Sequence, residues 1–154
     1  MKEYDSQKAA RVWQRVQNEK QELPQPQSGN RLPALIMEQL QLSATYSHLS
    51  QQMAGRGGAV FMRLAREAKT QAVCLKGILT LMAGQSPVVG VSPVQISSSD
   101  VMLRRCYGQE LRLQKEYEHL KLDAEYGPVY ARMAERNREH CCVVLEMIGG
   151  LGRA

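Results

Sequence analysis

The sequence predicts an all-α protein built around four long helices, and three observations lead to this prediction. Helix-forming residues such as Leu, Ala, Gln, Glu and Arg dominate the 154 residues, which include one Trp and one Phe. Four long segments repeat apolar residues at helical spacing. A segment rich in Pro, Gly, Ser and Val, residues 85–99, separates the second of these from the third. A chain of this length can bury a core without disulfides or metal.

Start and stop signals bound each predicted helix. Pro33 lies in the first turn of the first helix, and Gly84 follows the second. The run SSSD, residues 97–100, supplies good N-caps for the third, and Pro128 suits the first turn of the fourth. Short turns make two antiparallel hairpins, and the long segment between them predicts a crossover. The predicted helices are 31–53, 58–83, 100–122 and 126–149.

A further helix is predicted before the bundle, over residues 1–21. Ala9, Val12, Trp13 and Val16 form a narrow apolar stripe along it. The Pro- and Gly-containing stretch 22–30 is a linker, and residues 31–154 form the bundle domain. We expect the N-terminal helix to dock on the bundle or on a neighbouring subunit, in a homo-oligomer such as a dimer.

The net charge of +5 arises from basic residues that are scattered rather than clustered. This spacing is typical of solvated helix faces, so nucleic-acid binding is not expected, although a basic nucleic-acid-associated oligomer stays a third candidate function. No apolar signal core and no stretch of ~18 apolar residues is present, so no membrane partner is predicted. The scattered arginines are Arg63, Arg66, Arg104, Arg105, Arg132, Arg136 and Arg138.

The four cysteines form no C-x-x-C pair, and all lie in predicted helices. Their spacing does not indicate a zinc site. We expect reduced thiols, in or near the core, in a cytoplasmic protein. The cysteines are Cys74, Cys106, Cys141 and Cys142.

Polar residues interrupt the inward stripe of each bundle helix near its middle. Residues spaced alternately three and four positions apart lie along one face of each predicted helix, and apart from these polar residues this inward stripe is apolar. A carboxylate on such a stripe is costly unless it is paired or bound to metal, so polar residues at similar depth predict a shared polar centre. Its members are Gln39, Gln71, Glu110, Asn137 and His140, with Tyr46 and Tyr117 nearby.

The two halves of the bundle also resemble each other in sequence. Gln39 and Tyr46 correspond to Glu110 and Tyr117, each 71 residues later. Between the second and fourth helices, the stretch 60–65 corresponds to 129–134. The sequence therefore suggests a duplicated helical hairpin.

Segments 61–84 and 125–150, together with this polar seam, resemble the rubrerythrin-like branch of the ferritin-like superfamily. In that family each half supplies a Glu from its first helix and a Glu-x-x-His from its second, and together these hold two iron or manganese ions. A Tyr often lies seven residues after the first Glu. The resemblance implies a ferritin-like four-helix bundle.

Carried over position by position, most of the family's ligands are missing. The lone Glu of the second half is Glu110, but its Glu-x-x-His falls on Asn137 and His140. In the first half the lone Glu falls on Gln39, and the Glu-x-x-His on 68 and 71, which are Ala and Gln. The resemblance therefore implies a degenerate diiron site in which Glu110 and His140 remain.

Two interpretations of Glu110 and His140 stay open. They form either a buried hydrogen-bonded network with the neighbouring amides or a residual mononuclear metal site. Glu38, Glu67 and Glu139 lie beside the stripes, roughly 100° around their helices, and a helix rotation would bring one of them inward. The regular stripes argue against such a rotation.

The expected function is a non-catalytic structural or interaction module with no cofactor. The alternative is a rubrerythrin-like oxidoreductase, a peroxidase or oxidase that uses an altered or mononuclear iron or manganese site. The chain has no C-x-x-C pairs of the rubredoxin type, which form the electron relay of full rubrerythrins. Their absence counts against the oxidoreductase, although some relatives of that family also lack the relay.

Overall fold

The computed structural model describes residues 28–84, 88–91 and 93–151, which form helices and connections and no strand. The prediction of an all-α protein is confirmed, and the helix ends agree with prediction to within a few residues. None of these helices is both long and apolar enough to cross a bilayer. The predicted N-terminal helix 1–21 lies outside the described residues. The helices are α2 (Ser28–Gln52), α3 (Arg56–Ala83), α4 (Ser99–Leu120) and α5 (Gly127–Leu151).

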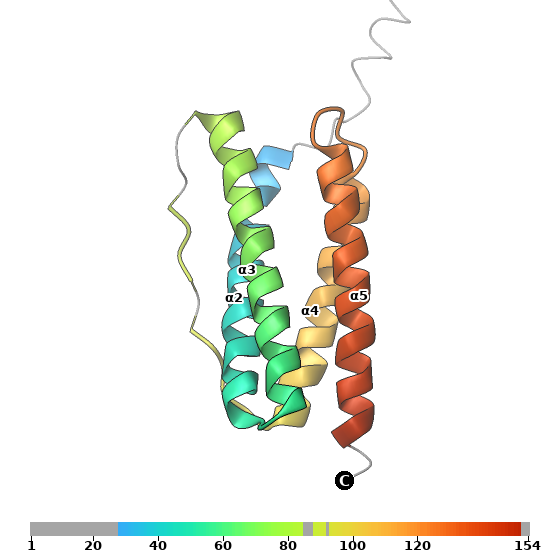
Figure 1. Cartoon of the computed structure of the whole chain (residues 1–154). Helices are drawn as coiled ribbons and strands as arrows, with labels where there is room; N and C mark the ends of the chain where they lie inside the picture. The colour runs from blue at the N-terminus through green and yellow to red at the C-terminus, as the bar shows by residue number, and fades with distance from the viewer. Residues whose placement is uncertain (1–27, 85–87, 92, 152–154) are drawn as a thin grey trace, which may run out of the picture.

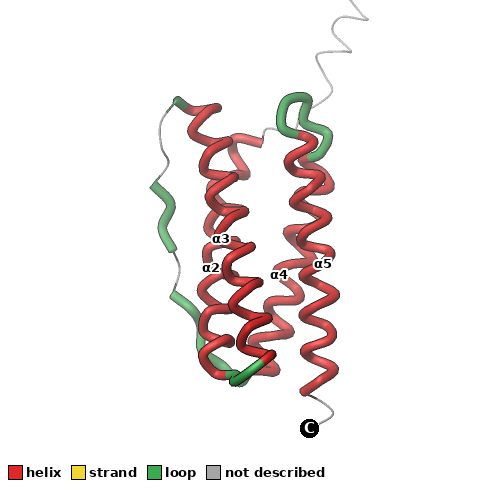
Figure 2. Tube along the Cα trace, in the orientation of Figure 1, coloured by secondary structure: helices red, strands yellow, loops and turns green. Residues whose placement is uncertain are grey.

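The four helices form two antiparallel pairs, α2 with α3 and α4 with α5 (Figure 1). Helices α3 and α4 run in the same direction, because the connection between them returns along the length of the bundle. Its described parts, 88–91 and 93–98, lie along the outer side of the α2–α3 pair (Figure 2). A crossover therefore lies between the two hairpins, where the composition of the sequence places it.

Packing between the two hairpins is uneven. Helix α2 packs mainly on α3, α4 mainly on α5, and the hairpins meet chiefly through α2 and α4. Helices α3 and α5 approach each other least closely. The seam between α3 and α5 is therefore the most open side of the bundle.

The core follows the predicted stripes. Leucines such as Leu42, Leu64 and Leu113 are fully buried, and each contributes about 1.5–3 kcal/mol by leaving water. Met82 is an exception, with 44% exposure, because it lies in the last turn of α3, just before the C-cap Gly84. The spacing of apolar residues in the sequence continues the inward stripe of the second predicted helix to Met82, and for this residue the prediction of burial is wrong.

Glycines at equivalent positions allow both hairpin turns to be tight. A side chain at Gly58 would collide with the carbonyl oxygen of Met53, and one at Gly127 would collide with that of Lys121. The two glycines lie 69 residues apart, which is the offset between the second and fourth helices of the repeat. The hairpins therefore share a turn as well as a stripe.

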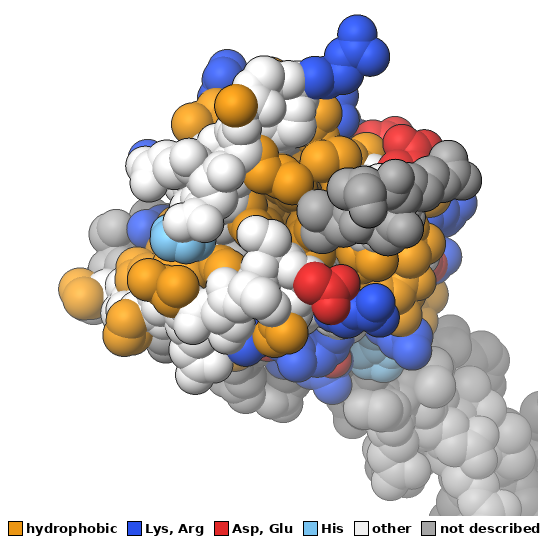
Figure 3. Space-filling view, turned by 90° about the horizontal axis from the view of Figure 1, so that it is seen from below, with side chains coloured by type: hydrophobic (Ala, Val, Ile, Leu, Met, Phe, Trp, Pro, Cys, Tyr) orange, Lys and Arg blue, Asp and Glu red, His pale blue; other side chains and the backbone are white. Residues whose placement is uncertain are grey.

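Methionines cover the end of the bundle at which α3 begins. A Cβ atom at Gly57 would lie 3.5 Å from Cε of Met147 and 3.6 Å from Sδ of Met53. Both methionines are half-buried and pack against the core. The view of this end shows apolar side chains between polar ones (Figure 3).

The cysteines divide into two buried and two exposed residues. Cys106 and Cys141 are buried, whereas Cys74 and Cys142 are exposed, so the expectation of four core or near-core thiols is wrong for half of them. Adjacent helical residues point roughly 100° apart, so Cys141 and Cys142 cannot both face the core. Burial raises the pKa of Cys106 to about 12 and that of Cys141 to about 11, with the charge of Glu110 adding to both. These two thiols therefore stay protonated at neutral pH.

Candidate functional site

Glu110 on α4 is the centre of a buried hydrogen-bond network. Its side chain is 0% exposed, because it takes the inward position between Cys106 and Leu113. Tyr46 on α2 donates from its hydroxyl to Oε1 over 2.8 Å, and Asn137 on α5 donates from Nδ2 to Oε2 over 2.5 Å. Both oxygens of the carboxylate are thus held by donors from other helices.

Tyr46 remains a hydroxyl donor because ionisation is disfavoured at this depth. Burial, and then the charge of Glu110, raise the pKa of Tyr46 well above its usual value of 10.0. The O–H···O bond to Glu110 consequently has a fixed direction, from phenol to carboxylate. It joins the first hairpin to the second through the core.

His140 on α5 links this core carboxylate to a second one. Its Nδ1 lies 3.1 Å from Oε1 of Glu110, and its Nε2 lies 2.6 Å from Oε2 of Glu67 on α3. Glu67 is also paired with Arg136, over 3.2 Å, and its side chain is 27% exposed. A continuous polar chain therefore runs from the core through His140 to the open side of the bundle.

The two carboxylates favour the protonated form of His140. Burial lowers the pKa of His140, but the hydrogen bonds and negative charges of Glu110 and Glu67 together outweigh it and raise the pKa above 6.5. A neutral imidazole has one N–H and an imidazolium has two. Only the imidazolium can donate to both carboxylates at once.

In the other half of the polar centre, the neutral amides of Gln39 and Gln71 occupy the positions equivalent to Glu110 and His140. Gln39 on α2 donates from Nε2 to Oε1 of Gln71 on α3 and, over 3.0 Å, to the hydroxyl of Tyr117 on α4. All three side chains are buried. This half of the centre holds no charge.

The contacts repeat between the halves, as the sequence repeat predicts. The contact of Tyr46 with Glu110 corresponds to that of Tyr117 with Gln39, each joining one hairpin to the other. The aromatic pairs correspond as well, with ring centroids 6.2 Å and 6.5 Å apart. The equivalent positions of the two halves therefore differ in chemistry: one half holds charged side chains and the other holds neutral ones. The two aromatic pairs are Tyr46 with Phe61, and Tyr117 with Tyr130.

The bundle brings together every residue predicted for the polar centre. The sequence stripes missed Glu67, whose side chain extends from the flank of its helix to His140 without any rotation of the inward face. Of the other flanking carboxylates, Glu38 pairs with Arg112 over 3.1 Å, and Glu139 is exposed. The residues brought together are Gln39, Tyr46, Gln71, Glu110, Tyr117, Asn137 and His140.

These side chains do not fit a two-ion site. Glu110 and Glu67 contact opposite nitrogens of His140, so the three groups do not converge on one point. Within the described residues, no group of three or more His, Cys, Asp or Glu side chains is arranged to hold a metal ion. Amides and Ala68 occupy the other positions, and bridging two dications requires several carboxylates.

Comparisons with protein-family models, with curated proteins and with solved structures found no match to this chain. The assignment of a function therefore rests on the geometry of the site.

Stability should depend on pH through His140. Folding raises its pKa, so its stabilising contribution is fully present below the unfolded value of about 6.5 and is lost as the pH rises through the folded value. The difference in free energy of unfolding between wild type and His140→Gln should be largest at about pH 5.5 and shrink toward about pH 8.5. Urea unfolding across this range measures it. His119→Gln, at an exposed imidazole on α4, is the control, and a difference that stays constant with pH contradicts the imidazolium assignment.

Proposed function

We propose that the chain is a ferritin-like bundle of the rubrerythrin-like kind that acts as a non-catalytic structural or interaction module. In this proposal a hydrogen-bonded centre takes the place of the two-metal site. The observation that carries it is the environment of Glu110, whose two oxygens are engaged by Tyr46, Asn137 and His140. Hydrogen-bond donors of the protein thus stabilise the buried negative charge of this carboxylate, as metal ions would in a two-metal site.

The charges of the centre support the same conclusion. With His140 protonated, its positive charge lies against Glu110, and the second carboxylate, Glu67, is shared with Arg136. Buried charges are tolerated when they are paired and hydrogen-bonded in this way. The charges of the centre balance without a dication, and in the neutral half the amide of Gln39 donates to the carbonyl oxygen of Gln71.

The arrangement of the helices supports the ferritin-like part of the proposal. Two antiparallel hairpins joined by one long crossover are typical of that fold, and the candidate ligand positions all lie at mid-height on the inward faces. The proposal treats four of these six positions as former ligands. The six are Gln39, Ala68, Gln71, Glu110, Asn137 and His140.

The metal content of the protein tests this function. The protein is made in medium supplemented with iron and manganese, purified without chelator or affinity tag, and submitted to elemental analysis. We expect fewer than about 0.1 ions per chain, because no set of anionic ligands converges. About one ion per chain, lost in both Glu110→Ala and His140→Ala, would favour a mononuclear site, and about two would favour a metal-dependent oxidoreductase.

A further inference from the structure

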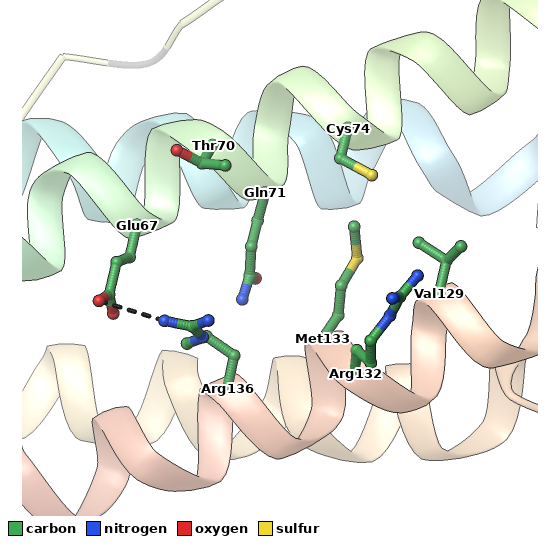
Figure 4. A pocket seen from close by; sticks show the side chains of 8 residues that line it. All are labelled: Glu67, Thr70, Gln71, Cys74, Val129, Arg132, Met133 and Arg136. Atoms are coloured by element: carbon green, nitrogen blue, oxygen red, sulfur yellow. Dashed lines mark ion pairs between the residues drawn. The ribbon is translucent and has the colours of Figure 1, made fainter.

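A pocket of about 220 Å³ opens between α3 and α5, on the side where the two hairpins approach each other least. In Figure 4, side chains from α3 extend toward α5, and those from α5 extend toward α3. Its volume is below the ~300 Å³ at which drug-sized ligand sites begin, so it suits a small molecule. The lining residues are Glu67, Thr70, Gln71, Cys74, Val129, Arg132, Met133 and Arg136.

The charge of the lining favours an anion. Two guanidinium groups, Arg132 and Arg136, and one carboxylate, Glu67, line the pocket, which leaves one positive charge in excess. Arg136 is paired with Glu67, whereas Arg132 has no ion-pair partner among the residues that the structure describes. A guanidinium offers five N–H donors, so Arg136 also keeps donors beyond its pair with Glu67.

The groove between α2 and α4 shows that this excess is not a general feature of the bundle. Its two arginines are both neutralised, Arg31 by Glu116 over 2.9 Å and Arg112 by Glu38 over 3.1 Å. Positive and negative side chains are equal in number along that groove. The groove therefore has no excess positive charge to attract an anion.

Gln71 adds a neutral donor at the inner wall of the pocket. It is 7% exposed, and its Oε1 is held by the amide of Gln39. Figure 4 shows its side chain extending from α3 with the amide nitrogen at its tip. Within the described part of the chain no hydrogen bond joins this nitrogen to another residue, and it is not among the fully buried atoms without a partner, so a donor accessible from the pocket lies at its wall.

The rest of the lining is apolar. Met133 is buried and Val129 is half-buried, and both form part of the pocket wall from α5. Methionine adapts its shape to a flat or irregular apolar group. A ligand that filled the pocket would therefore combine one negative charge with a short apolar portion.

We propose that this pocket binds a small organic monoanion, a carboxylate carried by a short apolar or aromatic group. Arg132, which has no ion-pair partner among the described residues, receives the carboxylate, and Met133 and Val129 beside it receive the apolar portion (Figure 4). Arg136 and the amide of Gln71 line the other end of the pocket. The charge excess of one selects a monoanion over a dianion. The pocket shares Glu67 and Gln71 with the polar centre, but its binding of an anion does not depend on whether that centre descends from a metal site.

Benzoate, with benzamide as its neutral isostere, tests the proposal on the full-length protein. Two-dimensional NMR titration at low salt follows the amide signals of 67–74 and 129–136. We expect saturable shifts with a dissociation constant of about 1 mM, and benzamide should bind at least ~10-fold more weakly. The affinity for benzoate should fall as salt is raised, because part of it is electrostatic.

Arg132→Gln supplies the decisive variant, since Arg132 is exposed and its replacement should leave the fold intact. It should weaken benzoate binding at least ~10-fold, the cost of a charged hydrogen bond. Arg138→Gln is the matched control, because Arg138 is on the same helix but is paired with Glu135 and does not line the pocket. The proposal is overturned if benzoate causes no shifts up to ~10 mM, if benzamide binds equally well, or if both variants behave alike.

Discussion

Replacing Glu110 by Ala should lower the free energy of unfolding by about 3–5 kcal/mol, a large part of the 5–15 kcal/mol typical of a domain. The substitution removes the acceptor of three buried donors, Tyr46, Asn137 and His140, and leaves a cavity. It also leaves the charge of His140 without its core partner. Urea unfolding followed by circular dichroism measures the loss.

Two further substitutions separate the causes of this loss. Glu110→Leu fills the space but leaves the three donors unpaired, so it should remain strongly destabilising, by about 2–4 kcal/mol. Glu110→Gln keeps one acceptor oxygen, so it should lower the free energy of unfolding less than Glu110→Ala or Glu110→Leu does. Glu116→Ala is the control on the same helix, since Glu116 is a partly exposed residue paired with Arg31, and it should cost less than about 1 kcal/mol. A loss below 1 kcal/mol for Glu110→Ala would show that the centre is not needed for stability.

Much of the fold could be predicted because helical periodicity fixes the direction of each side chain near its backbone. Steps of three and four residues placed Gln39, Glu110 and His140 on inward faces, and all three are buried. Gly84 marked the end of α3, where it adopts the left-handed conformation with φ 71°. These signals are local, so a single sequence contains them.

The position of the tip of a long side chain could not be predicted in the same way. Glu67 begins on the flank of α3, yet its carboxylate reaches His140, because a glutamate spans several ångströms beyond its Cβ. Arg132 and Arg136 have the spacing of a solvated face, and they line a pocket because α3 and α5 approach each other less closely than the other neighbouring helices do. The separation of two helices depends on the packing of the whole bundle, which no local pattern specifies.

The sequence repeat places different chemistry at equivalent positions of the two halves. Equivalent positions hold Gln39 and Gln71 in one half and Glu110 and His140 in the other. A carboxylate and an imidazole restrict the possible chemistry, whereas two amides satisfy each other in many geometries. The sequence therefore indicated a shared centre, and the structure divides it into a charged and a neutral part.

A variant that restores the four missing ligands should gain metal. Gln39→Glu, Ala68→Glu, Gln71→His and Asn137→Glu together rebuild a Glu and a Glu-x-x-His in each half, at positions that are buried and equivalent. We expect this fourfold variant to bind about two manganese or iron ions per chain. Without metal it should be less stable than wild type, because three added carboxylates lie in the core.

Metal should reverse that loss of stability. Binding to the folded state stabilises by about 2.7 kcal/mol at a free ion concentration of 100 times the dissociation constant, so the melting temperature should rise with manganese and fall with chelator. Wild type should show neither change. The control adds Glu110→Gln to the four substitutions, which removes one native ligand and should reduce the metal content. A fourfold variant that folds but binds no metal would argue against a former two-metal site. In that case the six candidate positions could not bring their ligands together around two ions, as the proposal requires.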